Sequence, residues 1–366
     1  MLNNVRKILS PILLPISLLY GFIIYIRNRL FDYDILTSTQ FNIPVISIGN
    51  ITVGGTGKTP HVEYLANLLQ SEFKVATLSR GYKRKTKGFK LAENNSTANE
   101  IGDEPRQIKQ KFPDIEVAVD NKRVRGIENL LATKKDLDVI LLDDAFQHRQ
   151  VQTNLSILLV DYSRPIDKDF MLPLGNLREQ AFEKKRASII IITKAPKEIK
   201  PIERRIIFNE LKPYPFQDVY FTTFDYGSLV PVFKDSDFND RALKSPDVLL
   251  VTGIANPASL EKHIKENISD TIIKMKYPDH YDFKEKDLEK IEQKFNTLTS
   301  SNKIIITTEK DAMRLHKFAN IAGDFKNSIF YIPINVRFLN NKTDNFNQQI
   351  TDYVRNNKKH SFLYPG

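Results

Sequence analysis

The chain has 366 residues, enough for about two domains with buried cores. It contains no cysteine, which excludes disulfides and thiolate metal sites, so any metal must be held by oxygen or nitrogen ligands. The formal net charge of +10 suits an anionic partner such as a membrane surface, a nucleotide or a phosphorylated substrate. We expect no nucleic-acid partner, because the sequence has neither zinc-ligand spacing nor an aromatic RNA-binding signature.

An uncharged apolar run from Ile8 to Ile26 lies near the start of the chain, with two basic residues before it and two soon after it. As a helix this run would be roughly 28 Å long, close to the hydrocarbon thickness of a bilayer. Pro11 and Pro15 would disturb a straight spanning helix, and the absence of a small-residue cleavage site argues against a cleaved signal peptide. We interpret residues 1–30 as a membrane-associated helix that spans the bilayer or lies in its interface, with a buried core helix as the alternative.

The next stretch is typical of a phosphate-binding loop. An apolar strand, Val45 to Ile48, leads into a glycine-rich turn, and Lys58 and Thr59 then open an apolar-periodic helix. Backbone N–H groups of such a turn close around phosphate oxygens, and the helix N-terminus adds favourable partial charge. Lys58 is expected to reach the β- and γ-phosphates of ATP and the Thr59 hydroxyl to ligate Mg²⁺, although the strict motif has a glycine where Thr52 stands. The predicted ATP-binding residues are Thr52, Val53, Gly54, Gly55, Thr56, Gly57, Lys58 and Thr59.

A second acidic motif supports this interpretation. Leu137 to Asp144 is an apolar run that ends in two carboxylates, as expected of a buried parallel strand that delivers Asp at its carboxyl end. One of Asp143 and Asp144 would support Mg²⁺, directly or through water. Gln147 and His148 follow and are expected to point into the same cleft, with a solvated or core position as the alternative for the histidine.

Three arginines are further candidates for contacts with phosphate or substrate, together with Gln147 and His148. Arg80 follows a strand predicted over residues 74–78, Arg123 belongs to a helix predicted over residues 120–131, and Arg178 lies in a turn-rich segment. Each could neutralise charge on a transferred phosphoryl group.

The remaining chain alternates apolar strands with helical patterns, which predicts an α/β fold with a parallel sheet covered on both faces. The sequence predicts a P-loop NTPase-like parallel-sheet domain and a second, smaller α/β domain, with a linker near residues 160–165. The predicted strands are 115–119, 155–160, 188–193, 219–224, 248–252, 303–308 and 329–334, and helices are predicted, for example, at 257–267 and 284–298. The predicted domains are the membrane-associated helix at 1–30, the P-loop domain at 31–162, the second α/β domain at 163–340 and a polar helical tail at 341–366.

Two loops of the second half carry polar groups with simple structural explanations. Residues 277–283 place His280 among acidic residues, where a solvated histidine is the plainer interpretation. Residues 307–314 follow a strand and open a helix whose first turn Glu309 and Asp311 could cap. Neither loop indicates a site by itself.

Several segments in this order resemble one family. The segments are Gly49–Pro60, S-R-G-Y at 79–82, G-D-E-P at 102–105, L-D-D-A-F-Q-H-R at 142–149, L-P-L-G-N-L-R-E at 172–179, P-D-H-Y-D-F at 278–283 and T-E-K-D-A at 308–312. Together they resemble tetraacyldisaccharide 4′-kinase, the lipid A 4′-kinase family of membrane-associated enzymes in lipopolysaccharide synthesis. The matches run from the N-terminal apolar segment to about Arg314, and the family also carries a residue other than glycine where Thr52 stands.

The resemblance implies transfer of the ATP γ-phosphoryl group to the 4′-hydroxyl of a tetraacylated glucosamine disaccharide 1-phosphate, the lipid A precursor. It implies that Lys58 is a catalytic residue, that Asp103 matches the catalytic carboxylate and that His280 matches its partner histidine. Glu104 and the two aspartates at 143–144 match acidic positions near Mg²⁺.

The resemblance also implies how the enzyme is organised. Two α/β domains are joined by a short linker, and the second domain closes over the substrate cleft. The expected location is the cytoplasmic face of the inner membrane, where the N-terminal helix anchors the chain to the membrane surface. We expect a monomer.

Two other function classes fit parts of the pattern. A membrane-associated P-loop ATPase or GTPase could switch a protein partner, but the I-T-K-A-P run at 192–196 lacks the aspartate of a guanine-reading motif. A nucleotide-binding scaffold without activity is disfavoured because Asp103, Glu104 and the aspartate pair supply catalytic-type carboxylates. Consumption of ATP that depends on a disaccharide lipid would separate the kinase from both.

Overall fold

The computed structural model describes residues 4–233, 245–300, 302–318 and 324–363. The chain divides into two compact units. The first unit comprises Met1–Asn94, Ile108–Phe224 and Val336–Gly366, and the second comprises Asn95–Gln107 and Asp225–Asn335.

The N-terminal part of the first unit is helical, with α1 at Asn4–Ile8 and α2 at Ser10–Asp32. Pro11 lies in the first turn of α2, where proline is tolerated, and the helix continues through Pro15. Among the described residues α2 is the one helix long and apolar enough to cross a membrane. Most of its apolar side chains are exposed, which excludes the alternative of a buried core helix.

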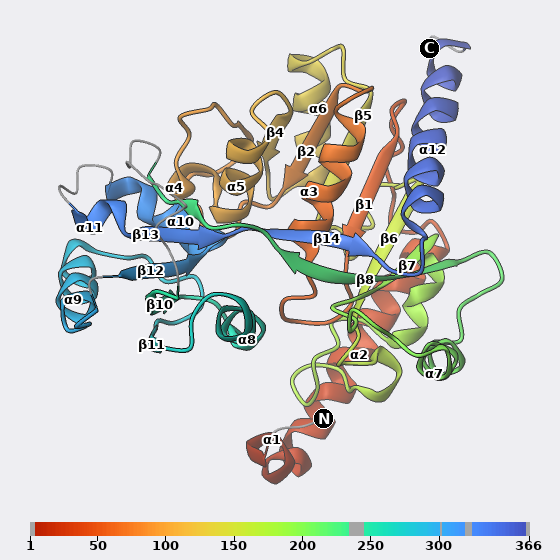
Figure 1. Ribbon diagram of the computed structural model, residues 1–366. Helices are drawn as coiled ribbons and strands as arrows, with labels where there is room; N and C mark the ends of the chain where they lie inside the picture. The colour runs from red at the N-terminus through yellow and green to blue at the C-terminus, as the bar shows by residue number, and fades with distance from the viewer. Residues whose placement is uncertain (1–3, 234–244, 301, 319–323, 364–366) are drawn as a thin grey trace. The chain divides into compact units, whose positions relative to one another are not determined.

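A nine-stranded sheet, in the order β14-β8-β7-β6-β1-β5-β2-β4-β3, forms the centre of the first unit (Figure 1). The strands from β8 to β4 in this order pair in parallel, and β3 pairs antiparallel with β4. Every residue of β1, β2, β5, β6 and β7 is buried, as expected of parallel strands covered on both faces. The strand bounds are β1 Val45–Gly49, β2 Val75–Ser79, β3 Lys90–Leu91, β4 Glu116–Val119, β5 Val139–Asp143, β6 Leu155–Asp161, β7 Ile189–Thr193, β8 Asp218–Tyr226 and β14 Ile334–Phe338.

Helices cover this sheet with apolar faces whose spacing follows the helical period. The helix α3, at Lys58–Leu69, buries Val62, Leu65, Ala66 and Leu69. The other helices of the unit are α6 Arg123–Thr133, α7 Pro201–Leu211 and α12 Thr343–Leu363, with short 3-10 helices at Ile166–Lys168 and Ala181–Arg186. The long helix α12 lies in the segment predicted as a helical tail.

The second unit is built on a five-stranded sheet in the order β11-β10-β12-β13-β9, in which only β9 runs antiparallel to its neighbour. Alternate residues of β10 enter opposite apolar clusters, Leu249 and Val251 on one face, Val248 and Leu250 on the other. The strand bounds are β9 Val230–Pro231, β10 Asp247–Thr252, β11 Ile272–Lys276, β12 Lys303–Thr308 and β13 Ile329–Ile332. The helices are α4 Ala98–Ile101, α5 Asp103–Lys111, α8 Ala258–Asn267, α9 Glu285–Asn296, α10 Glu309–Leu315 and α11 Asp324–Asn327, with a 3-10 helix at His316–Phe318.

The division between units differs from the predicted boundary at residue 162. β7 pairs with β6 and β8 pairs with β7, so residues 163–224 belong to the first sheet. The segment at 160–165, predicted as a linker, lies within the first unit. The boundaries fall instead between β3 and α4 and inside α5, β8 and β14. The strand predicted over 329–334 is divided by Pro333 into β13 and β14.

Candidate active site

The glycine-rich loop between β1 and α3 has the geometry that its sequence predicts. Gly54 and Gly57 have φ angles of 98° and 88°, which side chains other than glycine rarely adopt. A Cβ atom on Gly57 would also lie 2.5 Å from the Phe224 ring. Lys58 is the first residue of α3, directly after the left-handed Gly57. The loop therefore ends at a helix N-terminus, where an anion is favoured.

Thr52 occupies its place without backbone strain. Its φ is not positive, and its backbone forms a bridge with Leu177, next to a hydrogen bond from Val53 N to Asn176 O of 2.8 Å. The loop is thus joined at this point to the segment around residue 177, and the backbone there has no need of a glycine.

Two buried side chains hold the rest of the loop. Asn50 Nδ2 donates to Thr56 Oγ1 at 2.9 Å, and Thr193 Oγ1 donates to Thr56 O at 2.9 Å. His61 packs under the turn, with Nδ1 2.7 Å from Gly57 O. Burial lowers the pKa of His61 to about 4, so this ring is neutral and structural at physiological pH.

The end of β5 brings the acidic pair to this loop. Ile48 of β1 and Asp143 of β5 are register partners, and Asp143 is buried. Lys58 Nζ lies 3.7 Å from Asp144 Oδ1. Burial opposes ionisation of Asp144, but the charges of Lys58 and Arg178 outweigh it and lower the pKa of this carboxyl to about 2. Asp144 is therefore a carboxylate at neutral pH.

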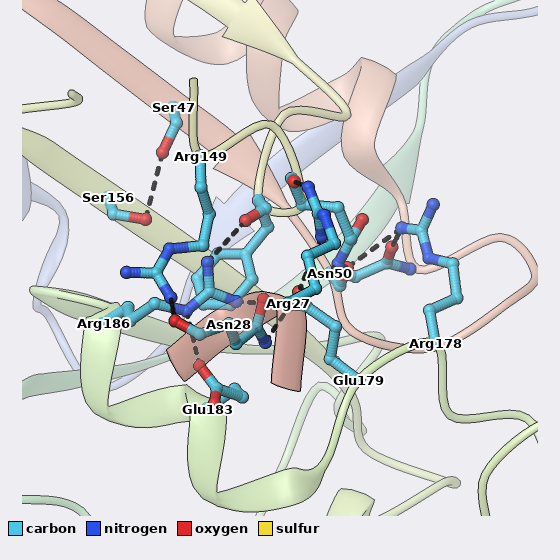
Figure 2. Close-up of polar contacts among 12 residues, drawn as sticks. Arg27, Asn28, Ser47, Asn50, Arg149, Ser156, Arg178, Glu179, Glu183 and Arg186 are labelled. Carbon is cyan, nitrogen blue, oxygen red and sulfur yellow. Dashed lines mark hydrogen bonds and ion pairs between the residues drawn. The ribbon is translucent and has the colours of Figure 1, made fainter. Parts of the chain in front are cut away.

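Arg178 and Gln147 meet at one carbonyl group of the loop, that of Asn50. Arg178 Nη2 lies 2.9 Å from Asn50 O (Figure 2). The same nitrogen lies 2.8 Å from Asp144 Oδ1. Gln147 Nε2 donates to the same Asn50 O at 2.8 Å. The structure thus places both residues beside the phosphate-binding loop, although they follow Asn50 by 97 and 128 positions in the sequence.

Arg123 and His148 lie near the acidic pair Asp143 and Asp144. Arg80, the third predicted arginine candidate, is exposed. Arg123 is 2% exposed, and its guanidinium donates to Asp143 O at 3.3 Å. Burial lowers the pKa of Arg123 to about 10, which leaves it charged at neutral pH. Burial, aided by the positive charge of Arg123, lowers the pKa of His148 to about 4, so the histidine is neutral there. The region is therefore rich in positive charge and suits a polyphosphate.

The oxygen atoms at this end of the first sheet fit Mg²⁺. Thr59, Asp143 and Asp144 offer a hydroxyl and two carboxylates, which are hard donors of the type that Mg²⁺ prefers. Within the described part of the chain, no group of three or more His, Asp or Glu side chains could hold a metal by itself. Mg²⁺ is commonly bound by one or two carboxylates together with substrate phosphates, so the donor set suits a metal that arrives with a nucleotide.

A second polar cluster, within the second unit, joins Asp103 and His280. Asp103 begins α5 directly after Gly102, and its Oδ2 lies 3.1 Å from His280 Nδ1. Arg314 of α10 donates to the same oxygen from Nε at 3.0 Å and from Nη2 at 2.6 Å. Burial opposes ionisation of Asp103, but hydrogen bonds from His280 and Arg314 lower its pKa to about 2. Asp103 is thus held as a carboxylate by two neighbours.

Glu104 and Asp311 complete this second cluster. Lys310 Nζ pairs with Glu104 Oε1, and Arg314 Nη1 donates to Asp311 Oδ1 at 2.6 Å. The N-cap of α10 is Thr308, whose hydroxyl accepts from Asp311 N at 3.1 Å. Asp311 therefore fixes the far side of the Arg314 guanidinium. The role of Glu104 at a metal stays a prediction. Glu104 belongs to the second unit, whereas Thr59 belongs to the first.

Arg314 and Glu179 are two residues of these clusters that the sequence did not single out. Arg314 is 5% exposed and contacts Asp103, 211 positions earlier in the chain. Its spacing of three from Asp311 on a helix is a weak signal of the ion pair that the structure contains. Glu179 is fully buried, and its carboxylate contacts Gln147 and Arg186. For Glu179 no local signal exists beyond its position next to Arg178.

The chain is similar to known proteins along nearly its whole length. The family model of tetraacyldisaccharide-1-P 4′-kinase matches residues 9–355. The tetraacyldisaccharide 4′-kinase of Bacteroides thetaiotaomicron is 48% identical over 359 residues, covering 95% of this chain and 94% of that one. The same-named protein of Phocaeicola vulgatus is 48% identical and covers 98% of this chain and 99% of its own.

A solved structure is similar over nearly the whole chain. The crystal structure of the "apo" form of LpxK from Aquifex aeolicus in complex with ATP superposes with a TM-score of 0.74 and 29% sequence identity. The match covers 96% of this chain and 99% of the other. The P-loop, the acidic pair and the matches over nearly the full length lead to one conclusion: the chain belongs to the tetraacyldisaccharide-1-P 4′-kinase family.

Proposed function

We propose that the chain is an ATP-dependent lipid kinase that transfers the γ-phosphoryl group of ATP to the 4′-hydroxyl of tetraacyldisaccharide 1-phosphate in lipid A biosynthesis. The observation that carries this proposal is the phosphate-binding loop, where Lys58 and Arg178 both contact Asp144 Oδ1, in a chain of this family. A membrane-associated ATPase that switches a protein partner is not favoured, because the relatives that match along the whole chain are kinases.

The first unit supplies the groups that would hold the nucleotide. The loop N–H groups and Lys58 would bind the β- and γ-phosphates, and Arg178 would add a second positive charge. Thr59 with Asp143 and Asp144 would hold Mg²⁺, which when bound neutralises charge on the phosphates. Asp144 is already ionised beside Lys58, so it can accept a metal without first losing a proton.

The second unit supplies the groups that would act on the sugar hydroxyl. We propose that Asp103 accepts the hydrogen bond of the 4′-hydroxyl and takes its proton as the new O–P bond forms and the bond to ADP breaks. A carboxylate with a pKa of about 2 is a weak base, but the loose transition state of phosphoryl transfer needs proton removal only late. His280 and Arg314 would hold the carboxylate in place.

The acceptor carries four acyl chains and stays in a bilayer, so the enzyme must reach the membrane surface. We propose that the exposed apolar side of α2 and its basic flanks bring the chain to the cytoplasmic face of the inner membrane. Exposed side chains of this helix include Ile12, Leu19, Phe22 and Ile23.

Replacing Leu19, Phe22 and Ile23 together by Ser is expected to reduce partitioning into anionic liposomes by more than tenfold. Each lost apolar side chain of this size removes about 1.5–3 kcal/mol of burial free energy when the side chain is fully inserted. Flotation of purified protein with liposomes measures this. A triple variant that floats like the wild type would show that another surface binds the membrane.

The proposed function is tested by measuring ATP consumption with and without tetraacyldisaccharide 1-phosphate in detergent micelles. We expect ADP to form only when the lipid is present, with one ADP for each phosphorylated lipid. A steady ATPase rate that is the same with and without the lipid would instead favour an ATPase that switches a protein partner.

A further inference from the structure

The segment that carries Arg178 is joined to the N-terminal helix α2 at three consecutive residues. Residues 178, 179 and 180 each hydrogen-bond to α2, through side chains or backbone. The bonds are Tyr20 Oη to Arg178 O at 3.1 Å, Asn28 Nδ2 to Glu179 Oε1 at 3.3 Å, and Gln180 Nε2 to Gly21 O at 2.5 Å. The segment that places Arg178 beside Asp144 is thus in direct contact with α2, once through its backbone and twice through its side chains.

The two sides of α2 have different surroundings. Its buried residues, Ser17, Gly21, Asn28 and Phe31, recur at spacings of three, four and seven and form one stripe. Ser17 Oγ adds a hydrogen bond of 2.7 Å to the carbonyl of residue 171, so contact with the domain extends along most of the helix. α2 is therefore packed lengthwise on the first unit, and its opposite side is exposed.

Glu179 connects this stripe to the phosphate-binding loop (Figure 2). Its carboxylate is fully buried and accepts hydrogen bonds from Asn28 of α2 and from Arg186. It also accepts one from Gln147 Nε2 at 3.3 Å. A buried carboxylate is stable only while its partners remain in place. Gln147 Nε2 also donates to Asn50 O, the carbonyl that Arg178 contacts. An unbroken set of polar contacts therefore runs from Asn28 to the base of the loop.

We propose that Asn28 and Tyr20 are positioning residues for the nucleotide site, so that the seating of the membrane-associated helix sets how well the site binds ATP. Backbone bonds to the loop, including Arg178 N to Ile51 O at 2.7 Å, hold residues 176–178 on one side, and the contacts with α2 hold residues 178–180 on the other. A displacement of about 1 Å at such a site is enough to lower activity strongly. The inference rests on the proposed function in one respect, namely that Arg178 contacts phosphate.

A double-mutant cycle tests the proposal on the full-length protein in detergent, with Mg²⁺-ATP affinity as the readout. We expect Asn28→Ala to weaken binding by about tenfold, the effect of losing one hydrogen bond to a charged group. In the Arg178→Ala background, Asn28→Ala should cause almost no further loss of ATP affinity, because Asn28 acts through the segment that carries this arginine. Additive losses would contradict the proposal.

Tyr20→Phe is a milder variant with a matched control. It removes one hydroxyl, so it is expected to fold even if Asn28→Ala does not, and to weaken ATP binding by about threefold. Tyr33→Phe removes the same hydroxyl from a residue that is 73% exposed at the end of α2. This variant should bind ATP with the affinity of the wild type. Equal affinities for Tyr20→Phe and the wild type would overturn the role of Tyr20.

Hydrogen exchange without nucleotide provides a readout that does not depend on the proposed activity. The amides of residues 172–180 should exchange at least several-fold faster in Asn28→Ala than in Tyr33→Phe, since their attachment to α2 is weakened. Unchanged exchange would contradict the proposal even if ATP affinity falls. If the wild type binds ATP but phosphorylates no lipid, the proposed function fails while this comparison remains valid.

Discussion

Replacing Asp103 by Asn is expected to lower kcat for lipid phosphorylation by roughly 10²–10⁴-fold while ATP affinity stays within about twofold. The amide keeps the size of the side chain but cannot take the proton of the 4′-hydroxyl. It also removes the negative charge that His280 and Arg314 contact at Asp103, while Arg314 keeps its ion pair with Asp311. Steady-state kinetics with saturating lipid, together with ATP binding by calorimetry, measure the two effects separately.

A matched control lies in the same unit. Asp270 is exposed, and Asp270→Asn makes the same chemical change away from the cluster, so its kcat should equal that of the wild type. Arg314→Lys keeps a positive charge but loses the two-nitrogen contact with Asp103 and should give an intermediate kcat. Near-wild-type turnover of Asp103→Asn would show that this carboxylate is not the base.

Lys58→Met should lower kcat/KM by at least about 10²–10³-fold, the effect of removing one preorganised positive group from a transition state. Here, unlike at Asp103, ATP binding should weaken as well, since Lys58 would contact phosphates in the ground state. The change also leaves Asp144 with Arg178 as its remaining cationic contact, and the two would pair more tightly. Kinetics at varied ATP concentration measure kcat and KM.

The control for this change is Lys135→Met, which removes a charge of the same kind from an exposed loop between α6 and β5. Its kinetics should match those of the wild type. If Lys58→Met retains both the affinity for ATP and kcat, the loop between β1 and α3 does not bind the transferred phosphate.

Features set by local sequence were predictable. The phosphate-binding loop combines an apolar strand, glycines that must adopt positive φ, and a helix start, all within about fifteen residues, and the structure forms each part. The acidic pair at the end of β5 was predictable for the same reason, because a strand buried on both faces reads as an apolar run.

Features set by contacts between distant residues were not predictable from the residues alone. β11 was missed because it lies at the edge of its sheet with Lys274 and Lys276 exposed, so its pattern is not that of a buried strand. The division into units differs from the predicted boundary because the pairing of β6 with β7 depends on tertiary structure. Arg314 was missed because its partner Asp103 lies 211 positions away.

The contact of His280 with Asp103 was implied by the family resemblance and not by the residues around His280. In sequence it is a histidine in an acidic loop, for which solvation is the plainer interpretation. In the structure it contacts Asp103 across 177 positions, as the family resemblance implied. Its part in the reaction stays a proposal until variants are measured.

The most direct test of the proposed activity is the position of the transferred phosphate. Purified protein would be incubated with γ-labelled ATP, Mg²⁺ and tetraacyldisaccharide 1-phosphate, and the lipid product examined by mass spectrometry and phosphorus NMR. We expect one added, labelled phosphate per disaccharide, attached at the 4′-oxygen, with no product from the Asp103→Asn variant above about 1% of wild type. Label at another position, or label released as free phosphate without lipid product, would contradict the proposed activity.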